Sequence, residues 1–161
     1  RWILAIAGWD ENDHESELKK LCSDLHLNSS VVFLGPQFDN DKSTCYQHCD
    51  AFILPSYSEG LPMTILEAWS YGKPILMTRE CNLPEGFSAG AAMKISTDSE
   101  DICQNLIRLF NSTPMELEEM GQNGLRLVVE KFSWEKIGEQ LNLICKWIVH
   151  GTARPDCIYV D

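Results

Sequence analysis

The segment Pro55–Pro74, PSYSEGLPMTILEAWSYGKP, decides the fold and the candidate site. It joins an apolar strand, Ala51–Leu54, to an expected helix, Pro62–Tyr71, and Gly72 is placed to end that helix. In an open α/β sheet, ligands bind outside the carboxyl ends of the strands. A helix N-terminus at that edge attracts anions, phosphate above all. The segment therefore predicts a phosphate-binding turn between strand and helix.

Two glutamates, Glu59 and Glu67, lie on either side of this turn. With Pro62 in the first helical turn, a rise of ~1.5 Å per residue separates them by very roughly 8–12 Å. Retaining glycosidases hold their two carboxylates only ~5–5.5 Å apart, so the spacing argues against that chemistry. This larger separation favours two carboxylates that bind the two ends of one elongated ligand. The same spacing also arises by chance, with Glu67 as a surface charge, and the residues alone leave both interpretations open.

A nucleotide-sugar has the elongated shape that this arrangement would hold. An ionised carboxylate only accepts hydrogen bonds, so each glutamate can accept a pair of them from vicinal hydroxyls. One glutamate would bind the ribose diol and the other the donor sugar. The diphosphate between them would lie at the backbone amides of Gly60, Leu61, Met63 and Thr64.

Composition narrows the class of protein. The 161 residues suit one domain, and a net charge of -11 argues against nonspecific nucleic-acid binding. Seven cysteines without a CxxC pair indicate free thiols in a reducing compartment. Cys45 and Cys49 flank His48 at helical spacing, which could suggest a metal site. The two cysteines are interpreted instead as small residues on a short helix, because no second pair of metal ligands accompanies them. No metal is expected to be required.

Apolar runs and helical patterns alternate along most of the chain, which predicts a Rossmann-like parallel sheet with helices on both faces. The last third is expected to be helical, with Ser133 capping the final helix. The predicted strands are Trp2–Ala7, Val31–Leu34, Ala51–Leu54, Pro74–Met77 and Ala91–Ile95. The predicted helices are Glu15–Leu27, Lys42–Cys49, Pro62–Tyr71, Ser99–Phe110, Pro114–Lys131 and Ser133–Val149.

The run PSYSEGLPMTILEAWSYGKPIL, from Pro55, closely resembles the signature of family 4 glycosyltransferases, retaining enzymes of the GT-B fold. Ile3–Gly8 resembles the family strand that ends in glycine, and Val31–Gly35 resembles the next strand and its nucleotide loop. Lys131–Trp134 is similar to the opening of a late family helix. The resemblance spans about Trp2 to Trp147, and its central motif is the specific part.

The resemblance implies a role for individual residues. Glu59 would meet the donor sugar near the reacting centre, as the catalytic residue, and Glu67 would bind the ribose hydroxyls. The residues implied around the diphosphate are Gly60, Leu61, Met63 and Thr64. The residues implied in the strand ends and the base-contacting loop are Gly8, Gly35, Pro36 and Gln37. The loop Cys81–Glu85 is expected to line the same crevice.

The resemblance also implies what the chain contains. Residues 1–150 would be the nucleotide-sugar-binding C-terminal domain of a GT-B enzyme without its first strand and helix, which carry a phosphate-clamping Arg and Lys in the family. Residues 151–161 would be a C-terminal tail. The chain alone is therefore expected to be inactive, with affinity for nucleotide-sugars weaker than micromolar.

For the full-length protein, the resemblance implies transfer of a sugar from a nucleotide-diphosphate sugar with retention at the anomeric carbon. The acceptor would bind through an N-terminal domain. It implies no cofactor beyond the donor, a role such as polysaccharide biosynthesis, and a cytoplasmic location with peripheral membrane association of the full-length protein. Two alternatives stay open: a nucleotide-sugar 2-epimerase of GT-B fold, and a non-catalytic nucleotide-sugar-binding module. Epimerases lack the full signature, and retention of both glutamates argues against loss of catalysis.

Overall fold

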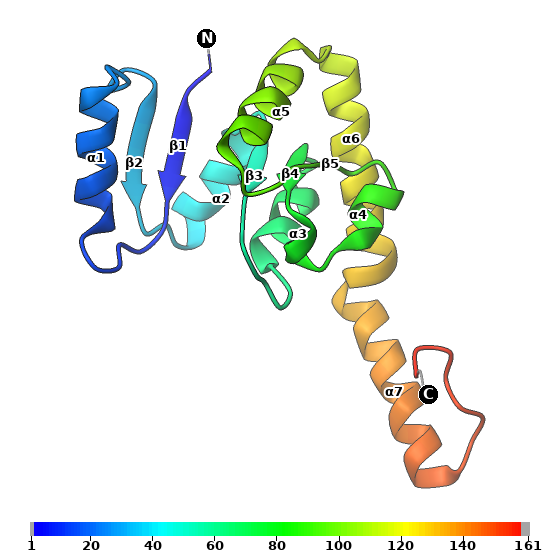
Figure 1. The fold of residues 1–161 in the computed structure, drawn as a ribbon. Coiled ribbons are helices and arrows are strands. Elements are labelled where there is room, and N and C mark those ends of the chain that lie inside the picture. The colour runs from blue at the N-terminus through cyan, green and yellow to red at the C-terminus, as the bar shows by residue number, and fades with distance from the viewer. Residues whose placement is uncertain (1, 159–161) are drawn as a thin grey trace. The chain divides into compact units, whose positions relative to one another are not determined.

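The computed structural model describes residues 2–158 and shows the α/β architecture that the sequence predicts (Figure 1). The chain divides into two compact units, Arg1–His48 and Cys49–Asp161. Every strand pairing in the described residues is parallel. The strands form two separate ladders, one in each unit, and the units are described in turn.

The first unit contains β1 (Leu4–Ala7), α1 (His14–Asp24), β2 (Val31–Gly35) and α2 (Asp39–His48). β1 and β2 run parallel, with Leu4 opposite Val31. The helix between them provides the crossover that two adjacent parallel strands require. Both strands therefore end at the same edge of their ladder.

Helix α1 is shorter than the predicted Glu15–Leu27. Leu25 leaves the helical conformation, and His26 has a left-handed backbone with φ of 56°, which ends the helix. Leu21 and Leu25 are also largely exposed, at 53% and 57%. The sequence therefore predicted this helix correctly but made it too long.

The second unit is built on β3 (Phe52–Leu54), β4 (Ile75–Met77) and β5 (Ala92–Lys94), in the order β3-β4-β5. All three residues of β4 are completely buried. This burial fits the central position of β4, since a strand in a covered parallel sheet is apolar on both faces. The loops after β3 and β4 leave the sheet at the same edge.

Helices make up the rest of the second unit. They are α3 (Met63–Ser70), η1 (Arg79–Cys81), α4 (Pro84–Ser88), α5 (Ser99–Asn111), α6 (Pro114–Leu127), the π-helical η2 (Val128–Phe132) and α7 (Trp134–His150). Helix α6 lies beside α3 and α4 (Figure 1). The two short elements η1 and α4 were not predicted, because a segment with proline and glycine so close together has no helical period.

Trp69 of α3 is the largest fully buried side chain of the core. Its indole Nε1 donates a 3.0 Å hydrogen bond to the carbonyl of Ala91. Two glycines allow helices to approach the ring closely: a Cβ at Gly86 of α4 would lie 2.6 Å from it, and one at Gly124 of α6 only 2.1 Å away. The ring therefore fills the space between three helices, and only glycine fits opposite it.

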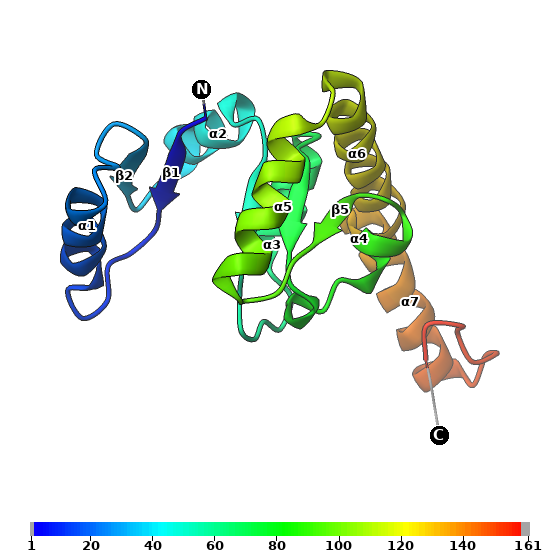
Figure 2. The ribbon, with the colours of Figure 1, turned by 45° about the horizontal axis from the view of Figure 1, so that its top comes forward.

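Helix α7 begins as the sequence predicted, because the side chain of Ser133 accepts a 3.3 Å hydrogen bond from the amide of Lys136. Figures 1 and 2 show α7 projecting away from the three-stranded sheet. Trp134 at its start is 86% exposed and Ile148 near its end is 70% exposed. None of the described helices combines the length and the apolar character needed to cross a membrane.

We expect Gly124→Ala to destabilise the second unit, because the added methyl group collides with the Trp69 ring. Overpacking of a filled core costs about 1–3 kcal/mol, and each kcal/mol lowers Tm by about 2–4 °C in a chain of this size. Gly138→Ala is the matched control, since its new Cβ meets no atom within 4 Å. Alanine in that exposed helix should raise stability by about 0.5–1 kcal/mol. Equal Tm values for the two variants would contradict this packing.

The start of α6 predicts a pH dependence of stability. The carboxylate of Glu116 accepts hydrogen bonds from the amide and the hydroxyl of Thr113, at 2.7 Å and 2.9 Å, and the backbone bond is the main reason that the pKa of Glu116 is lowered. A lowered pKa stabilises the fold above the unfolded-state value, and this contribution is lost as the pH falls through the folded-state value. In thermal melts, Glu116→Gln should lower Tm at neutral pH and converge with the unchanged protein in acid. Glu119→Gln, exposed on the same helix, is the control. A Glu116 difference in Tm that persists undiminished into acid would contradict this cause.

Candidate functional site

Glu59 lies in the loop between β3 and α3, where both its backbone and its side chain are held. Its carboxylate accepts a 2.7 Å hydrogen bond from the hydroxyl of Ser56. Its amide donates to the carbonyl of Glu80 at 2.9 Å, and its own carbonyl accepts from the side-chain amide of Asn82. The half-buried carboxylate therefore has a defined position, set partly by the loop that follows β4.

The start of α3 differs in one detail from the sequence prediction. Pro62 stands before the helix in an extended conformation, with φ of -73° and ψ of 99°, instead of in its first turn. Its carbonyl accepts the amide of Ile65 at 3.0 Å. Met63 and Thr64 are consequently the first two helical residues, whose amides have no acceptor within an α-helix.

Four backbone amides at the start of α3 are open, which here means that they donate to no acceptor in the described residues. In the part of the chain that the structure describes, no group accepts a hydrogen bond from the backbone amides of Gly60, Leu61, Met63 and Thr64. All four residues are exposed. Open amides at a helix N-terminus carry partial positive charge and suit an anion. These open amides can bind an anion, which is the property that the sequence analysis expected of a diphosphate site.

Glu67 is the fifth residue of α3 and is half-buried. Its neighbours Leu66 and Ala68 face the core, with 7% and 0% exposure. The backbone carbonyl of Glu67 accepts a 2.6 Å hydrogen bond from the hydroxyl of Ser70. Glu67 therefore stands at the boundary of the buried face, about one helical turn after the open amides of Met63 and Thr64.

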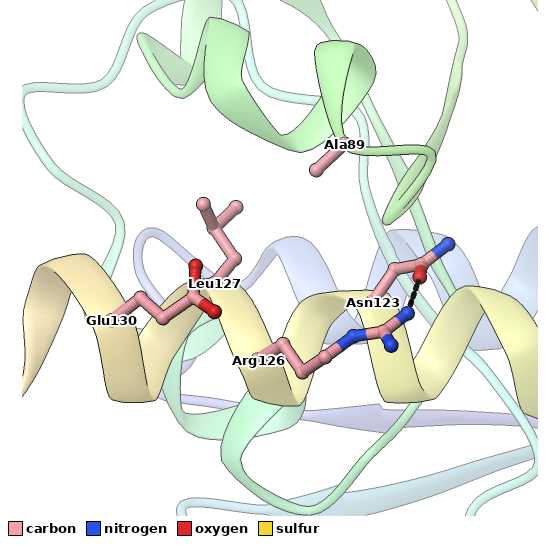
Figure 3. Close-up of a pocket in the computed structure, with 5 residues that line it drawn as sticks. All are labelled: Ala89, Asn123, Arg126, Leu127 and Glu130. Atoms are coloured by element: carbon pink, nitrogen blue, oxygen red, sulfur yellow. Dashed lines mark hydrogen bonds between the residues drawn. The ribbon is translucent and has the colours of Figure 1, made fainter.

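A hollow of about 210 Å³ in the second unit lies elsewhere, between α4 and α6 (Figure 3). Within it, the guanidinium of Arg126 donates a hydrogen bond to the side-chain oxygen of Asn123. None of the residues that the sequence assigned to the donor lines this hollow. Its lining residues are Ala89, Asn123, Arg126, Leu127 and Glu130.

The candidate residues of the first unit gather where β1 and β2 end. The amide of Gly8 donates to the carbonyl of Gly35 at 3.0 Å, and Gly35 has a left-handed φ of 67°. The side-chain amide of Gln37 donates to the carbonyl of Leu34 at 2.7 Å, which folds the loop back on its strand. Pro36 between them is exposed. Gly35, Pro36 and Gln37 thus form the turn after β2, and Gly8 at the end of β1 is hydrogen-bonded to it.

The expectation that no metal is required assumed that the chain has no Asp-x-Asp motif, and that assumption is wrong. Asp39 and Asp41 form an Asp-x-Asp pair in the first turn of α2, a spacing that can suggest a divalent cation. Across the described residues, however, no group of three or more His, Cys, Asp or Glu side chains could hold a metal ion. Acidic residues in the first turn of a helix also interact favourably with the helix dipole. This interaction is a sufficient reason for the presence of both aspartates.

A model of the family described as "Glycosyl transferases group 1" matches residues 1–127. The chain belongs to this family. The sequence resemblance to glycosyltransferases is thereby confirmed, and the match covers both the loop of Glu59 and the strand ends of the first unit.

Curated relatives of this chain are named as glycosyltransferases. MMP alpha-(1->4)-mannosyltransferase of Mycolicibacterium hassiacum is 30% identical over 76% of the chain and 30% of its own length. Mannosylfructose-phosphate synthase of Agrobacterium fabrum is 30% identical over 88% of the chain and 32% of its own length. The chain therefore spans about a third of the curated relatives that it matches.

Solved structures show the same fold at low identity. A glycosyltransferase from Rickettsia africae superposes with a TM-score of 0.83 at 18% identity, over 94% of this chain and 41% of its own. Anabaena Alr3699/HepE, solved in complex with UDP-glucose, gives a TM-score of 0.76 at 21% identity, over 89% and 40%. The predicted GT-B relationship is confirmed at the level of the fold.

Proposed function

We propose that this chain is the donor-binding part of a retaining glycosyltransferase that uses a nucleoside-diphosphate sugar. The observation that carries the proposal is the row of open amides at the start of α3, next to a Glu59 carboxylate that the loop holds in place. Relatives named as mannosyltransferases, and a structural neighbour solved with UDP-glucose, support this choice of ligand.

The diphosphate would bind at these open amides. A helix terminus contributes about 0.3–1 kcal/mol per charge where it is exposed. The overall charge of -11 opposes an anionic ligand, so its binding must depend on local groups that point directly at it. The donor would thus be held mainly by backbone hydrogen bonds of the turn between Gly60 and Thr64.

The two glutamates would bind the two ends of the donor. Glu67 would accept hydrogen bonds from the ribose hydroxyls, and Glu59 would accept them from the transferred sugar beside the anomeric carbon. Each of these assignments follows the family motif and agrees with the exposure of the residues concerned.

The reaction would break the bond between the anomeric carbon and the diphosphate oxygen. The acceptor oxygen would form its new bond from the same face, and its proton would pass to the departing phosphate, which retains the anomeric configuration. Stabilising the charge that develops on the leaving diphosphate would supply most of the rate. The acceptor would bind to the rest of the full-length protein, and no metal is proposed.

A titration of the full-length protein with UDP-glucose and GDP-mannose tests the donor assignment. Hydrogen bonds to a charged group contribute about 1.5–3 kcal/mol, so Glu67→Gln should weaken donor binding by roughly 10- to 100-fold. Glu59→Gln should instead lower the rate at which nucleoside diphosphate is released, with a smaller change in affinity. Glu119→Gln, exposed on α6, should change neither quantity.

Two results would count against the proposal. One is the failure of any nucleotide-sugar to raise Tm in a panel that includes other bases and sugars. The other is unchanged donor affinity and unchanged release rate in both glutamate variants. Release of an epimerised sugar instead of transfer would replace the proposal with the epimerase alternative.

A further inference from the structure

The loop of Glu59 is connected to the core through one buried hydroxyl. Thr78 follows β4 directly and is the sole polar side chain among the buried residues of the described chain. Its hydroxyl donates a 2.7 Å hydrogen bond to the backbone carbonyl of Ser56. The hydroxyl of Ser56 in turn donates to the Glu59 carboxylate at 2.7 Å. Two hydrogen bonds thus lead from the end of β4 to this carboxylate.

The number of available protons shows which group donates in each of the hydrogen bonds around Thr78. The Thr78 hydroxyl lies 3.5 Å from the thiol of Cys81, and that thiol is 3.7 Å from the carbonyl of Leu54. Each of these two groups has one proton to donate. The hydroxyl donates to the carbonyl of Ser56 and the thiol donates to that of Leu54, so the last carbonyl of β3 and the one two residues beyond it each have a donor. The Thr78 proton is therefore committed to Ser56.

We propose that Thr78 is a positioning residue for Glu59, acting through Ser56. The inference rests on the proposed function, in which the Glu59 carboxylate meets the donor sugar. The hydroxyl of Ser56 can reach Glu59 only while its backbone stays where Thr78 holds it. Because Thr78 is completely buried, it contacts no donor itself and acts on the reaction only by fixing this carboxylate.

The backbone of Glu59 is anchored separately. Its amide bonds to Glu80 and its carbonyl to Asn82, which has a left-handed φ of 55°. Loss of Thr78 should therefore leave the loop near its place and free mainly the side chain. Misplacement of a reacting group by 1 Å can cost about 10²-fold in rate, so a partly freed carboxylate should cost about 10-fold.

The experiment uses the full-length protein with UDP-glucose and GDP-mannose and measures nucleoside diphosphate release, donor affinity and Tm. Thr78→Val removes the donor proton at nearly constant volume, and Thr78→Ser restores it. Ser56→Ala removes the second bond from a half-buried position, which keeps the test valid if Thr78→Val fails to fold. Ile75→Val is the matched control, since Ile75 is equally buried in β4, three residues before Thr78, and has no polar side-chain group that could bond Ser56 or Glu59.

The expected result is a release rate about 10-fold lower in Thr78→Val and Ser56→Ala, with donor affinity within about twofold and recovery in Thr78→Ser. In a Glu59→Gln background, Thr78→Val should cause no further loss, because residues that act through one another are not additive. Additive losses, or an equal loss in Ile75→Val, would assign Thr78 to general stability and overturn the inference. If Glu59→Gln itself leaves the rate unchanged, the proposed function fails instead.

Discussion

The close packing of helices around Trp69 is the constraint on which the second unit depends. The ring is buried against glycines of α4 and α6, and its N–H satisfies the carbonyl of Ala91 next to β5. A buried indole needs such a partner, and a close-packed core tolerates no added atom at the contact. The position of α3, and hence the direction of its N-terminus, follows from this packing.

The candidate site is a consequence of that position. Since α3 starts at the carboxyl ends of β3 and β4, its open amides stand at the edge where α/β proteins bind ligands. The loops after these two strands are tied together by hydrogen bonds from Thr78, Asn82 and Glu59. One sheet edge thus supplies both the anion-binding amides and a carboxylate with a fixed position.

Much of this arrangement could be predicted from the sequence, and the exceptions have physical causes. The strands were predicted from short continuous apolar runs and the long helices from a helical repeat of apolar residues, and the motif around Glu59 suggested the candidate site. The end of α1 was missed because His26 adopts a left-handed backbone that its residue type does not announce. The role of Thr78 was missed because it depends on a contact with Ser56, 22 positions away in the chain. Local patterns do not encode such contacts.

The glycines of α6 have a further mechanical effect. A Cβ at Gly121 would lie 1.9 Å from the carbonyl oxygen of Gly72, so here the backbone of α6 touches the backbone at the end of α3 with no side chain in between. Side chains can change rotamer and absorb a small shift, whereas two backbones in contact cannot. Any displacement of α3 must therefore be shared by α6, and the open amides move only as part of a larger rigid block.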